Sequence, residues 1–318
     1  MQRILVAINF FNDEHMRRIC ATADGWAHVE RIDHEVELST YTDALKRCDI
    51  VVGWPPADGL VDANLRLVQL CSAGYDPYLG RGLEKKQDCV VCNARGVFSV
   101  PAAEQTLAMM FALTRRLNLH IRDQAQHLWK RAPDYRIVDG DTMCVIGLGS
   151  IGRAIAERCA GVGMNVVGVT RTGEEAAEPP LSRIVAFDKL AEVLPSAGHV
   201  ALSVPANSQT IGLFDEAMFR RMKPGSCFYN VARGSLMVEA DLINVLNDGH
   251  LWGAGLDVFD TEPLPADHPL WGFFNVVVTP HISGPSTPRE IGPIFNDNLR
   301  RYAANRPLRH LVDRTRGY

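Results

Sequence analysis

Short apolar runs alternate with stretches of helical periodicity over the first hundred residues. We predict strands at Arg3–Ile8, Asp49–Gly53, Leu67–Leu70 and Val90–Cys92, and a helix at Asp13–Thr22. Strands that alternate with helices are typical of parallel sheets covered by helices. The pattern therefore predicts an α/β first domain.

A long apolar helix is predicted to follow. Pro101 suits the first turn of a helix, and apolar positions recur at helical spacing from Ala102 to about Arg122. The stretch is apolar on all sides, which is unusual for a free surface helix. We expect it to bridge two domains and to contribute to a subunit interface.

A second α/β unit begins near Asp141. Its predicted strands are Thr142–Ile146, Asn165–Val169, His199–Ser203, Cys227–Val231, Gly255–Asp257 and Val276–Thr279. The tail from about Pro285 to Leu311 is helical and then polar, and we expect it to return to the first domain. The expected organisation is a discontinuous substrate-binding domain, 1–98 with 286–318, and a dinucleotide-binding domain, 99–285.

Composition narrows the class of protein. The chain has 318 residues, 47% of them hydrophobic, which is enough for two domains with buried cores. A formal net charge of −4 gives no basic excess for a nucleic-acid partner. The apolar stretch near Thr106–Leu113 stops at Arg115, well short of the roughly 20 residues of a membrane span. The first residues read as a strand rather than a signal peptide, so we expect a cytoplasmic location and no membrane partner.

The eight cysteines lie mostly in apolar runs, as reduced core cysteines do. Cys89 and Cys92 have the spacing of a redox or metal pair. Residues three apart in a strand face opposite sides, and no second pair accompanies them. We therefore interpret this pair as ordinary core cysteines and predict no metal site.

A glycine-rich turn follows the strand at Thr142–Ile146. Gly147, Gly149 and Gly152 fit the G-x-G-x-x-G pattern, and a helix is predicted directly after it, at Arg153–Ala160. In this context the first glycine permits a tight turn, the second lets a pyrophosphate approach, and the third lets the helix pack on the strand. The free N–H groups of the helix start then favour phosphate binding.

The end of the next strand bears on which nicotinamide cofactor binds. An NAD site usually has an acidic residue there, whereas this chain has Thr170, Arg171 and Thr172. Arginine can bind the 2′-phosphate of NADP, which a carboxylate would repel. We predict a preference for NADP(H), with NAD(H) possible. The alternative is that Arg171 is a solvated turn residue, and the nearby Glu174 and Glu175 weaken the signal.

Three later strands end in residues that can do chemistry. Arg233 follows Cys227–Val231, Glu262 follows Gly255–Asp257, and His281 follows Val276–Thr279. Ligands of open α/β sheets bind outside the carboxyl ends of the strands. An arginine, an acid and a histidine at one such edge predict an active site.

At this point the chain resembles the D-isomer-specific 2-hydroxyacid dehydrogenase family, in particular its glyoxylate/hydroxypyruvate reductase branch. The resemblance rests on the following motifs: Ser72–Asp76, Gly147–Gly152, Asn230–Gly234, Asp257–Phe259 with Glu262-Pro263, and Thr279–His281. It implies a Rossmann-like cofactor domain inserted in a flavodoxin-like substrate domain, with the active site in the cleft between them. It also implies a homodimer.

Within that resemblance each residue has an expected role. His281 donates a proton to the carbonyl oxygen of the substrate, because histidine ordinarily titrates near neutral pH. Glu262 holds the ring, and Arg233 binds the substrate carboxylate and polarises the carbonyl. Asp257 resembles the residue that orients the nicotinamide carboxamide, although it could instead cap a turn.

The remaining candidate contacts are less specific. Ala73 and Gly74 are expected to bind the substrate carboxylate through backbone N–H groups, and Trp54 either walls the substrate pocket or fills a core. The further residues assigned to the cofactor are Ser150, Ile151, Val204, Pro205, Thr210, Val231, Ala232 and His281. Arg95 is left unassigned. Ile282–Pro285 is more turn-prone than the resemblance implies, which bears on the shape of the site.

The sequence thus predicts an oxidoreductase that reduces a small 2-oxo acid, glyoxylate or hydroxypyruvate, to the D-2-hydroxy acid. One alternative is an enzyme like 3-phosphoglycerate dehydrogenase. The other is a dinucleotide-sensing scaffold without catalysis, against which the presence of both Glu262 and His281 argues.

Overall fold

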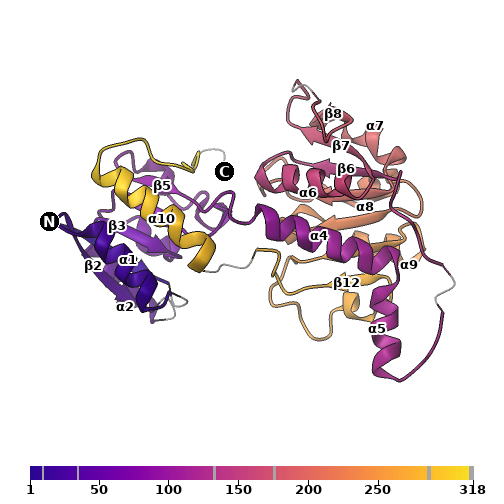
Figure 1. Ribbon diagram of the computed structural model, residues 1–318, viewed down its shortest axis with the longest axis horizontal. Helices are drawn as coiled ribbons and strands as arrows, with labels where there is room; N and C mark the ends of the chain where they lie inside the picture. Colours follow the sequence, from indigo (N-terminus) through magenta and orange to yellow (C-terminus); the bar gives the residue numbers. More distant parts are fainter. Residues whose placement is uncertain (9–10, 34–35, 132–133, 175–176, 285–287, 315–318) are drawn as a thin grey trace. The chain divides into compact units, whose positions relative to one another are not determined.

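The computed structural model describes residues 1–8, 11–33, 36–131, 134–174, 177–284 and 288–314, with only the backbone of 288–290. The chain forms two compact units (Figure 1). Unit 1 comprises Met1–Val97 and Pro285–Tyr318, and unit 2 comprises Phe98–Gly284. Each division falls one residue before the boundary expected from the sequence. The two units are described separately below.

Unit 1 contains a five-stranded parallel sheet in the order β2-β1-β3-β4-β5. The strands are β1 (Gln2–Ala7), β2 (Ala27–Ile32), β3 (Ile50–Gly53), β4 (Leu67–Leu70) and β5 (Val90–Cys92). This order is that of flavodoxin-like folds, in which ligands bind beyond the carboxyl ends of the strands. The predicted fold of this part of the chain is confirmed.

Helices cover both faces of this sheet. They are α1 (Asp13–Ala23), α2 (Leu38–Lys46), α3 (Ala57–Leu60) and α10 (Pro288–Ala303), with short 3-10 turns at Asp76–Tyr78 and Leu83–Lys85. Asn12 caps α1 by accepting a hydrogen bond from the backbone N–H of His15. The tail returns as predicted, because Asn298 on α10 donates to Gln69 on β4 (Nδ2 to Oε1, 2.7 Å).

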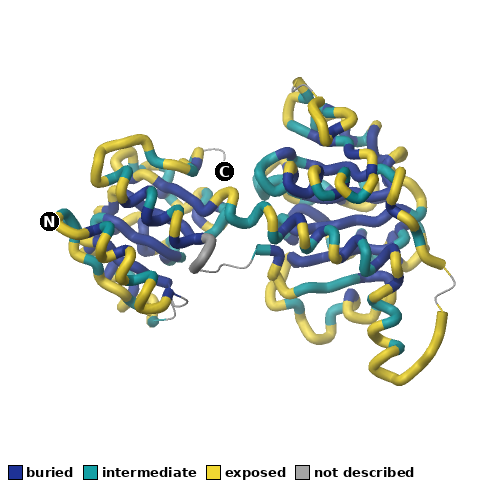
Figure 2. Tube along the Cα trace, in the orientation of Figure 1, coloured by how far each residue is buried: buried dark blue, intermediate teal, exposed yellow. Residues whose placement is uncertain are grey.

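Unit 2 contains a seven-stranded parallel sheet in the order β12-β11-β10-β9-β6-β7-β8. The strands are β6 (Thr142–Ile146), β7 (Asn165–Thr170), β8 (Arg183–Ala186), β9 (His199–Leu202), β10 (Cys227–Asn230), β11 (Gly253–Leu256) and β12 (Val276–Val278). The chain order reverses between β6 and β9, which is the crevice where Rossmann-like sheets bind dinucleotides. Figure 2 shows the strands buried between more exposed helices.

The helices of unit 2 enclose two apolar cores. They are α4 (Ser99–Thr114), α5 (Leu117–Ala125), α6 (Ser150–Gly161), α7 (Leu190–Val193), α8 (Glu216–Arg221) and α9 (Glu239–Asn247), with 3-10 turns at Phe187–Lys189, Leu194–Ser196, Gly234–Leu236 and Pro269–Gly272. On one face α4 and α6 pack together around Met109, Ile155 and Tyr229. On the other face Phe214, Phe219 and Phe228 pack ring to ring.

The prediction of one continuous helix from Ala102 to about Arg122 is wrong. α4 ends at Thr114, and α5 begins at Leu117 after Arg116 adopts a left-handed backbone (φ 56°). Arg116 is 4% exposed, its guanidinium lies 3.8 Å from the ring centre of Trp252, and it donates to Asp134. The break between the two helices therefore coincides with a buried contact of Arg116.

Several elements escaped the sequence pattern. β2 mixes polar and apolar residues, because it lies at the sheet edge and needs no continuous apolar run. The cysteine prediction is confirmed, since all eight are free and only Cys20 is exposed.

Among the described helices, none combines the length and apolarity needed to cross a membrane.

Candidate active site

The glycine-rich turn joins β6 to α6 under tight steric limits. Gly147 has φ +95°, and a Cβ atom there would lie 2.6 Å from the carbonyl oxygen of Ser203 on the neighbouring strand connection. A Cβ atom on Gly152 would lie 1.8 Å from the carbonyl oxygen of Gly147. Both glycines are therefore required by the turn itself and by the close approach of α6.

Gly149 has a different role. Its φ is −71°, which any residue adopts, and a Cβ atom there would have no neighbour within 4 Å. It is the N-cap of α6, and no side chain caps the first turn. The chain therefore leaves open space in front of uncapped helix N–H groups, an arrangement that suits an approaching anion. The turn fits the phosphates of a dinucleotide.

The end of β7 lies beside this turn. A Cβ atom on Gly168 would lie 2.4 Å from Leu148 Cδ1, so the glycine provides the space in which Leu148 holds the turn against the sheet. Thr170 Oγ1 accepts a hydrogen bond from the N–H of Gly173 (3.0 Å), which tightens the turn after β7. Arg171 and Thr172 are exposed. Glu175 lies outside the described residues.

The other predicted cofactor residues lie on both sides of the chain reversal. Val204 and Pro205 follow β9 and are half-buried, as are Ser150 and Ile151 at the start of α6. Thr210 is 6% exposed, and its hydroxyl donates to Pro205 O (2.6 Å). The structure therefore gives Thr210 a bracing role in the loop, and its contact with the cofactor stays a prediction.

His281 and Glu262 form the central pair of the candidate site. Nδ1 of His281 lies 2.7 Å from Oε2 of Glu262, and the His281 side chain is 50% exposed. The other carboxylate oxygen of Glu262 accepts the N–H of Phe259 (2.9 Å), which fixes the acid. A ring held by Nδ1 leaves Nε2 for a substrate, which is the geometry of a general acid.

The backbone around His281 is held in an unusual conformation. His281 has φ +52°, a left-handed value that costs a non-glycine residue about 1 kcal/mol or more. Asp257 offsets this cost, because its backbone oxygen accepts His281 N–H (2.8 Å) and its carboxylate accepts Ile282 N–H (2.9 Å) and Ser283 N–H (2.8 Å). Strain of this kind clusters at functional sites.

Asp257 is accordingly a structural anchor as well as a predicted cofactor contact. It is fully buried, and it also accepts a hydrogen bond from the hydroxyl of Thr279, which in turn accepts from Gln105 on α4 (3.2 Å). The alternative role for Asp257 considered from the sequence was to cap a turn, and in the structure its carboxylate does cap the turn that follows His281. The contact with the nicotinamide carboxamide stays a prediction.

Arg233 follows β10 and is half-buried. The turn before it is braced by Asn230, whose side chain donates to Arg233 O (2.8 Å) and accepts from Ala232 N (3.1 Å). A Cβ atom on Gly234 would lie 1.9 Å from the carbonyl carbon of Phe259. The loop of Arg233 therefore lies directly against the loop that carries Glu262.

A second histidine–glutamate pair in unit 2 differs in kind. His268 Nε2 lies 3.2 Å from Glu239 Oε2, and His268 Nδ1 accepts the N–H of Leu270 (3.3 Å). Both ring nitrogens are thus used within the chain, and the side chain is only 18% exposed. This pair supports the fold and offers a natural control for His281.

Three of the predicted substrate contacts, Trp54, Ala73 and Gly74, belong to unit 1. Trp54 follows β3 and Ala73 follows β4, which are neighbours in the sheet, so both lie at one edge, where the unassigned Arg95 follows β5. Asn93 holds the Ala73 loop by donating to Ala73 O (2.8 Å), and Ser72 donates to Gly74 O (2.8 Å). Trp54 is half-buried.

Sequence reasoning missed the bracing residues Gln105, Asn230 and Thr279. Asn230 and Thr279 stand inside the quoted motifs but received no role. A buried asparagine at a strand end is a usable signal, because its amide must find partners there. The contact of Gln105 joins residues far apart in the chain, so no local pattern could have indicated it.

Comparison with known proteins places this arrangement in one class. The D-isomer specific 2-hydroxyacid dehydrogenase NAD binding domain matches residues 107–283, more than half of the chain. The chain therefore belongs to the D-isomer specific 2-hydroxyacid dehydrogenase family, as the sequence motifs predicted.

Individual relatives refine the comparison. A D-3-phosphoglycerate dehydrogenase from Archaeoglobus fulgidus is 32% identical over 254 residues, covering 79% of this chain but 47% of the relative. The chain thus spans about half the length of that relative. A glyoxylate reductase from Korarchaeum cryptofilum is 32% identical over 279 residues, covering 81% of this chain and 83% of the relative.

A solved structure covers the whole chain. It is the NADPH-dependent glyoxylate/hydroxypyruvate reductase from Sinorhizobium meliloti, in complex with NADP and sulfate. The similarity has a TM-score of 0.84 at 25% identity and covers 100% of both chains. Relatives named for the predicted reductase branch are therefore among the matches.

Proposed function

We propose that this protein reduces a small 2-oxo acid, glyoxylate or hydroxypyruvate, to the D-2-hydroxy acid with NADPH. The observation that carries the proposal is the His281–Glu262 pair, 2.7 Å apart on a left-handed, anchored loop. A nicotinamide cofactor, when bound at the glycine-rich turn, supplies the hydride for the carbonyl carbon.

The residues of the chain supply the proton and the charge. His281 donates the Nε2 proton to the carbonyl oxygen as that oxygen gains negative charge, which completes the hydroxyl group. Glu262 fixes the ring through Nδ1 and offsets the positive charge of the protonated imidazole. Solvent returns the proton to Nε2, because the ring is half exposed.

Arg233 holds the substrate in this scheme. Its guanidinium can bind a carboxylate through two parallel hydrogen bonds and polarise the adjacent carbonyl. The proposal also assigns the N–H groups of Ala73 and Gly74 to binding of the substrate carboxylate. Their carbonyl oxygens already accept bonds from Asn93 and Ser72, so the loop is held with its backbone in a defined orientation.

The preference for NADP(H) rests on the end of β7. Arg171 and Thr172 are exposed there, and the residue whose side chain closes the turn is Thr170, not an acidic residue. A cation at this position attracts the 2′-phosphate of NADP, whereas a carboxylate would bind the 2′-hydroxyl of NAD. The named glyoxylate/hydroxypyruvate reductase of similar structure is NADPH-dependent, which supports the same choice.

The test is the initial rate of glyoxylate and hydroxypyruvate reduction with NADPH and with NADH, followed at the nicotinamide absorbance. We expect faster turnover with NADPH. His281→Gln and Glu262→Gln should lower kcat by about 10²-fold or more, because general acid catalysis contributes about 10²–10⁴-fold. His268→Gln is the matched control and should keep the rate, since both nitrogens of His268 are used within the chain.

Two outcomes would change the proposal. Oxidation of 3-phosphoglycerate at a higher rate than hydroxypyruvate reduction would favour the reaction named for the Archaeoglobus relative. Binding of NADPH, measured by its fluorescence, without turnover of any 2-oxo acid would favour a dinucleotide-sensing scaffold. Equal losses in His268→Gln and His281→Gln would refute the assigned proton donor.

We also propose that the protein is a homodimer whose interface includes exposed apolar residues of α5, of 128–131 and of 134–137. Trp129 is 99% exposed and Ile137 is 70% exposed, and Ile121 and Tyr135 are exposed close by in the chain. Large apolar side chains rarely face solvent together without a partner. A second copy of the chain is the expected occupant of this surface.

The dimer is tested by sedimentation velocity on the full chain. Trp129→Glu with Ile137→Glu should convert the dimer to a monomer, because two charges would be buried unpaired in the interface. Leu38→Glu, at an equally apolar exposed position on α2, should leave the dimer intact. A monomeric parent chain would refute the proposal.

The cytoplasmic location remains a proposal. All eight cysteines are free, and seven of them are buried. Free thiols suit a reducing compartment, since secreted proteins commonly oxidise theirs. Fractionation of cells that express the chain would test it.

A further inference from the structure

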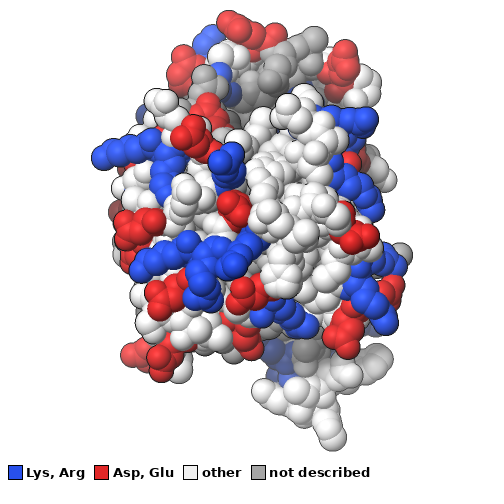
Figure 3. Space-filling model, turned by 90° about the vertical axis from the view of Figure 1, so that its left-hand side faces the viewer, with Lys and Arg blue, Asp and Glu red and all other residues white. Residues whose placement is uncertain are grey.

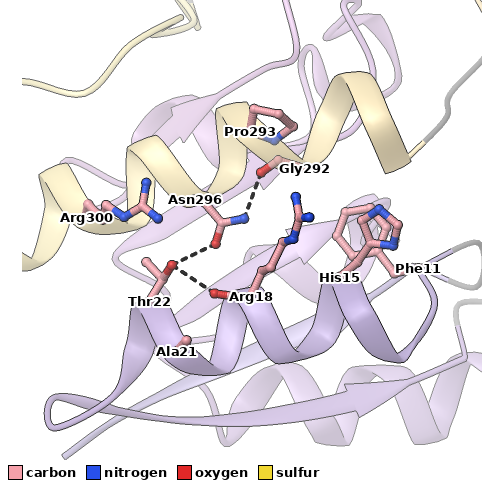
Figure 4. A pocket seen from close by; sticks show the side chains of 9 residues that line it. All are labelled: Phe11, His15, Arg18, Ala21, Thr22, Gly292, Pro293, Asn296 and Arg300. Carbon is pink, nitrogen blue, oxygen red and sulfur yellow. Dashed lines mark hydrogen bonds between the residues drawn. The ribbon is translucent and has the colours of Figure 1, made fainter.

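A cavity of about 580 Å³ lies between α1 and α10 of unit 1 (Figure 4). Its lining residues all come from these two helices and the loop before α1: Phe11, His15, Arg18, Ala21, Thr22, Gly292, Pro293, Asn296 and Arg300. The volume is in the range of small-molecule sites. None of these residues belongs to the candidate active site, and the glycine-rich turn lies in the other unit.

The lining is basic. It contains Arg18 and Arg300, and no acidic residue is among its described members. Figure 4 shows Arg18 reaching from α1 toward α10 on one side of Asn296, with Arg300 on the other side. Two guanidinium groups from two helices thus flank one cavity.

Both arginines can accept a new anionic partner. Arg18 contacts Glu14 (2.5 Å), but both side chains are more than half exposed, and such surface pairs contribute little to stability. Asp297, on the same helix as Arg300, is already paired with Arg301 and Arg309. Replacing the ion pair between Arg18 and Glu14 by a contact with a bound anion therefore costs little free energy.

Beside Arg18, the half-buried ring of His15 lines the cavity (Figure 4). The rings of His15 and Phe11 stack with centroids 5.3 Å apart. His15 Nδ1 lies 2.5 Å from Asn12 Oδ1, which orients the ring. A ring of a ligand can pack on this wall while its charged group meets the arginines.

The wall formed by α10 contains two residues that disfavour a helix. Gly292 and Pro293 lie inside α10, where both residue types are less favourable than alanine. Gly292 faces the ring of His15, because an added Cβ atom would lie 3.7 Å from His15 Cδ2, at van der Waals distance. Asn296 is buried and braces the cavity floor, donating to Gly292 O (3.0 Å) and accepting from Thr22 Oγ1 (2.9 Å).

We propose that this cavity binds a small organic phosphate, with the phosphate between Arg18 and Arg300 and a ring against His15. Arginine binds phosphate oxygens through its planar fork. On the face of the molecule in Figure 3, basic side chains form separate groups with acidic ones between them. Such a mixed face suits a small discrete anion better than an extended polyanion.

The test is calorimetric titration of the full chain with inorganic phosphate and with phenyl phosphate, in saturating NADPH so that the cofactor site is filled. Phenyl phosphate should bind more tightly than inorganic phosphate. Arg18→Gln and Arg300→Gln should each weaken both by about tenfold or more, as expected for loss of a charge-assisted hydrogen bond. His15→Ala should weaken phenyl phosphate but leave inorganic phosphate almost unchanged.

Two control variants separate this site from general electrostatics and from misfolding. Arg17→Gln removes an equal charge from the next, exposed position of α1 and should leave binding intact. Ala21→Leu keeps every charge but fills the cavity, and should weaken phenyl phosphate. Equal losses in Arg17→Gln and Arg18→Gln, or no saturable binding of either probe by the parent chain, would overturn the proposal.

Discussion

Protonation of His199 should set the stability of unit 2 between neutral and alkaline pH. His199 is 2% exposed at the start of β9, with Nδ1 2.9 Å from the hydroxyl of Tyr229 and Nε2 3.5 Å from Asp141 Oδ2. Burial alone would lower its pKa, but hydrogen bonds to Asp141 and Cys227 outweigh burial and raise the pKa from 6.5 to about 9. The folded state therefore holds this proton more tightly than the unfolded chain.

The sign and size of the effect follow from linkage. A raised pKa contributes stability that is fully present below pH 6.5 and is lost as the pH rises through about 9. At about 1.4 kcal/mol per pH unit, that difference corresponds to about 3 kcal/mol of unfolding free energy. Asp141 takes part, since its hydrogen bond with His199 lowers the pKa of that carboxyl group.

The perturbation is His199→Gln, whose amide can donate to Asp141 without titrating. Denaturant unfolding of the full chain would be compared for parent and variant below pH 6.5 and above pH 9. We expect the parent to lose about 3 kcal/mol more than the variant across this range. The NMR titration of the His199 ring gives the pKa directly. Parallel stability curves for parent and variant, or a ring that titrates at or below 6.5, would refute the reasoning.

Three further predictions concern the candidate active site. Gly149→Ala should fold normally, because an added Cβ meets nothing, but should weaken NADPH binding measured by fluorescence, whereas Gly152→Ala should fail to fold stably. Arg171→Asp should raise KM for NADPH and lower KM for NADH, and an unchanged ratio would remove Arg171 from cofactor recognition. Asp257→Asn should lower kcat by about tenfold or more and lower the thermal midpoint of unfolding, because one loop N–H loses its charged acceptor. An unaltered kcat would count against the anchoring of His281 by Asp257.

The sequence was sufficient to predict those parts of the fold and of the candidate site that depend on local patterns. Buried parallel strands such as Leu67–Leu70 and Thr142–Ile146 are mostly apolar, and the structure has them at those residues. Arg233, Glu262 and His281 were recognisable because each follows such a strand. The helix break at Arg116 was not recognisable in this way, because the contact that accompanies it is with Trp252, more than a hundred residues later in the chain.

The same distinction holds within the candidate site. The spacing of Gly147, Gly149 and Gly152 predicted a turn, but it did not separate the two glycines required by packing from the one that faces open space. Asp257 was assigned to the cofactor, and its bonds to Ile282 and Ser283 became evident only from the folded loop. Roles that depend on which atoms meet across loops require the structure.

The anchoring of the His281 loop has a mechanical consequence. The chain leaves unit 2 after Gly284, only three residues beyond His281, so the proposed proton donor stands almost at the exit of its unit. Asp257 holds the two N–H groups between them, those of Ile282 and Ser283. Because Asp257 is fully buried and directly follows β11 in the sheet of unit 2, these two bonds fix the backbone next to His281 from within unit 2. The orientation of the proposed proton donor is therefore set by its own unit.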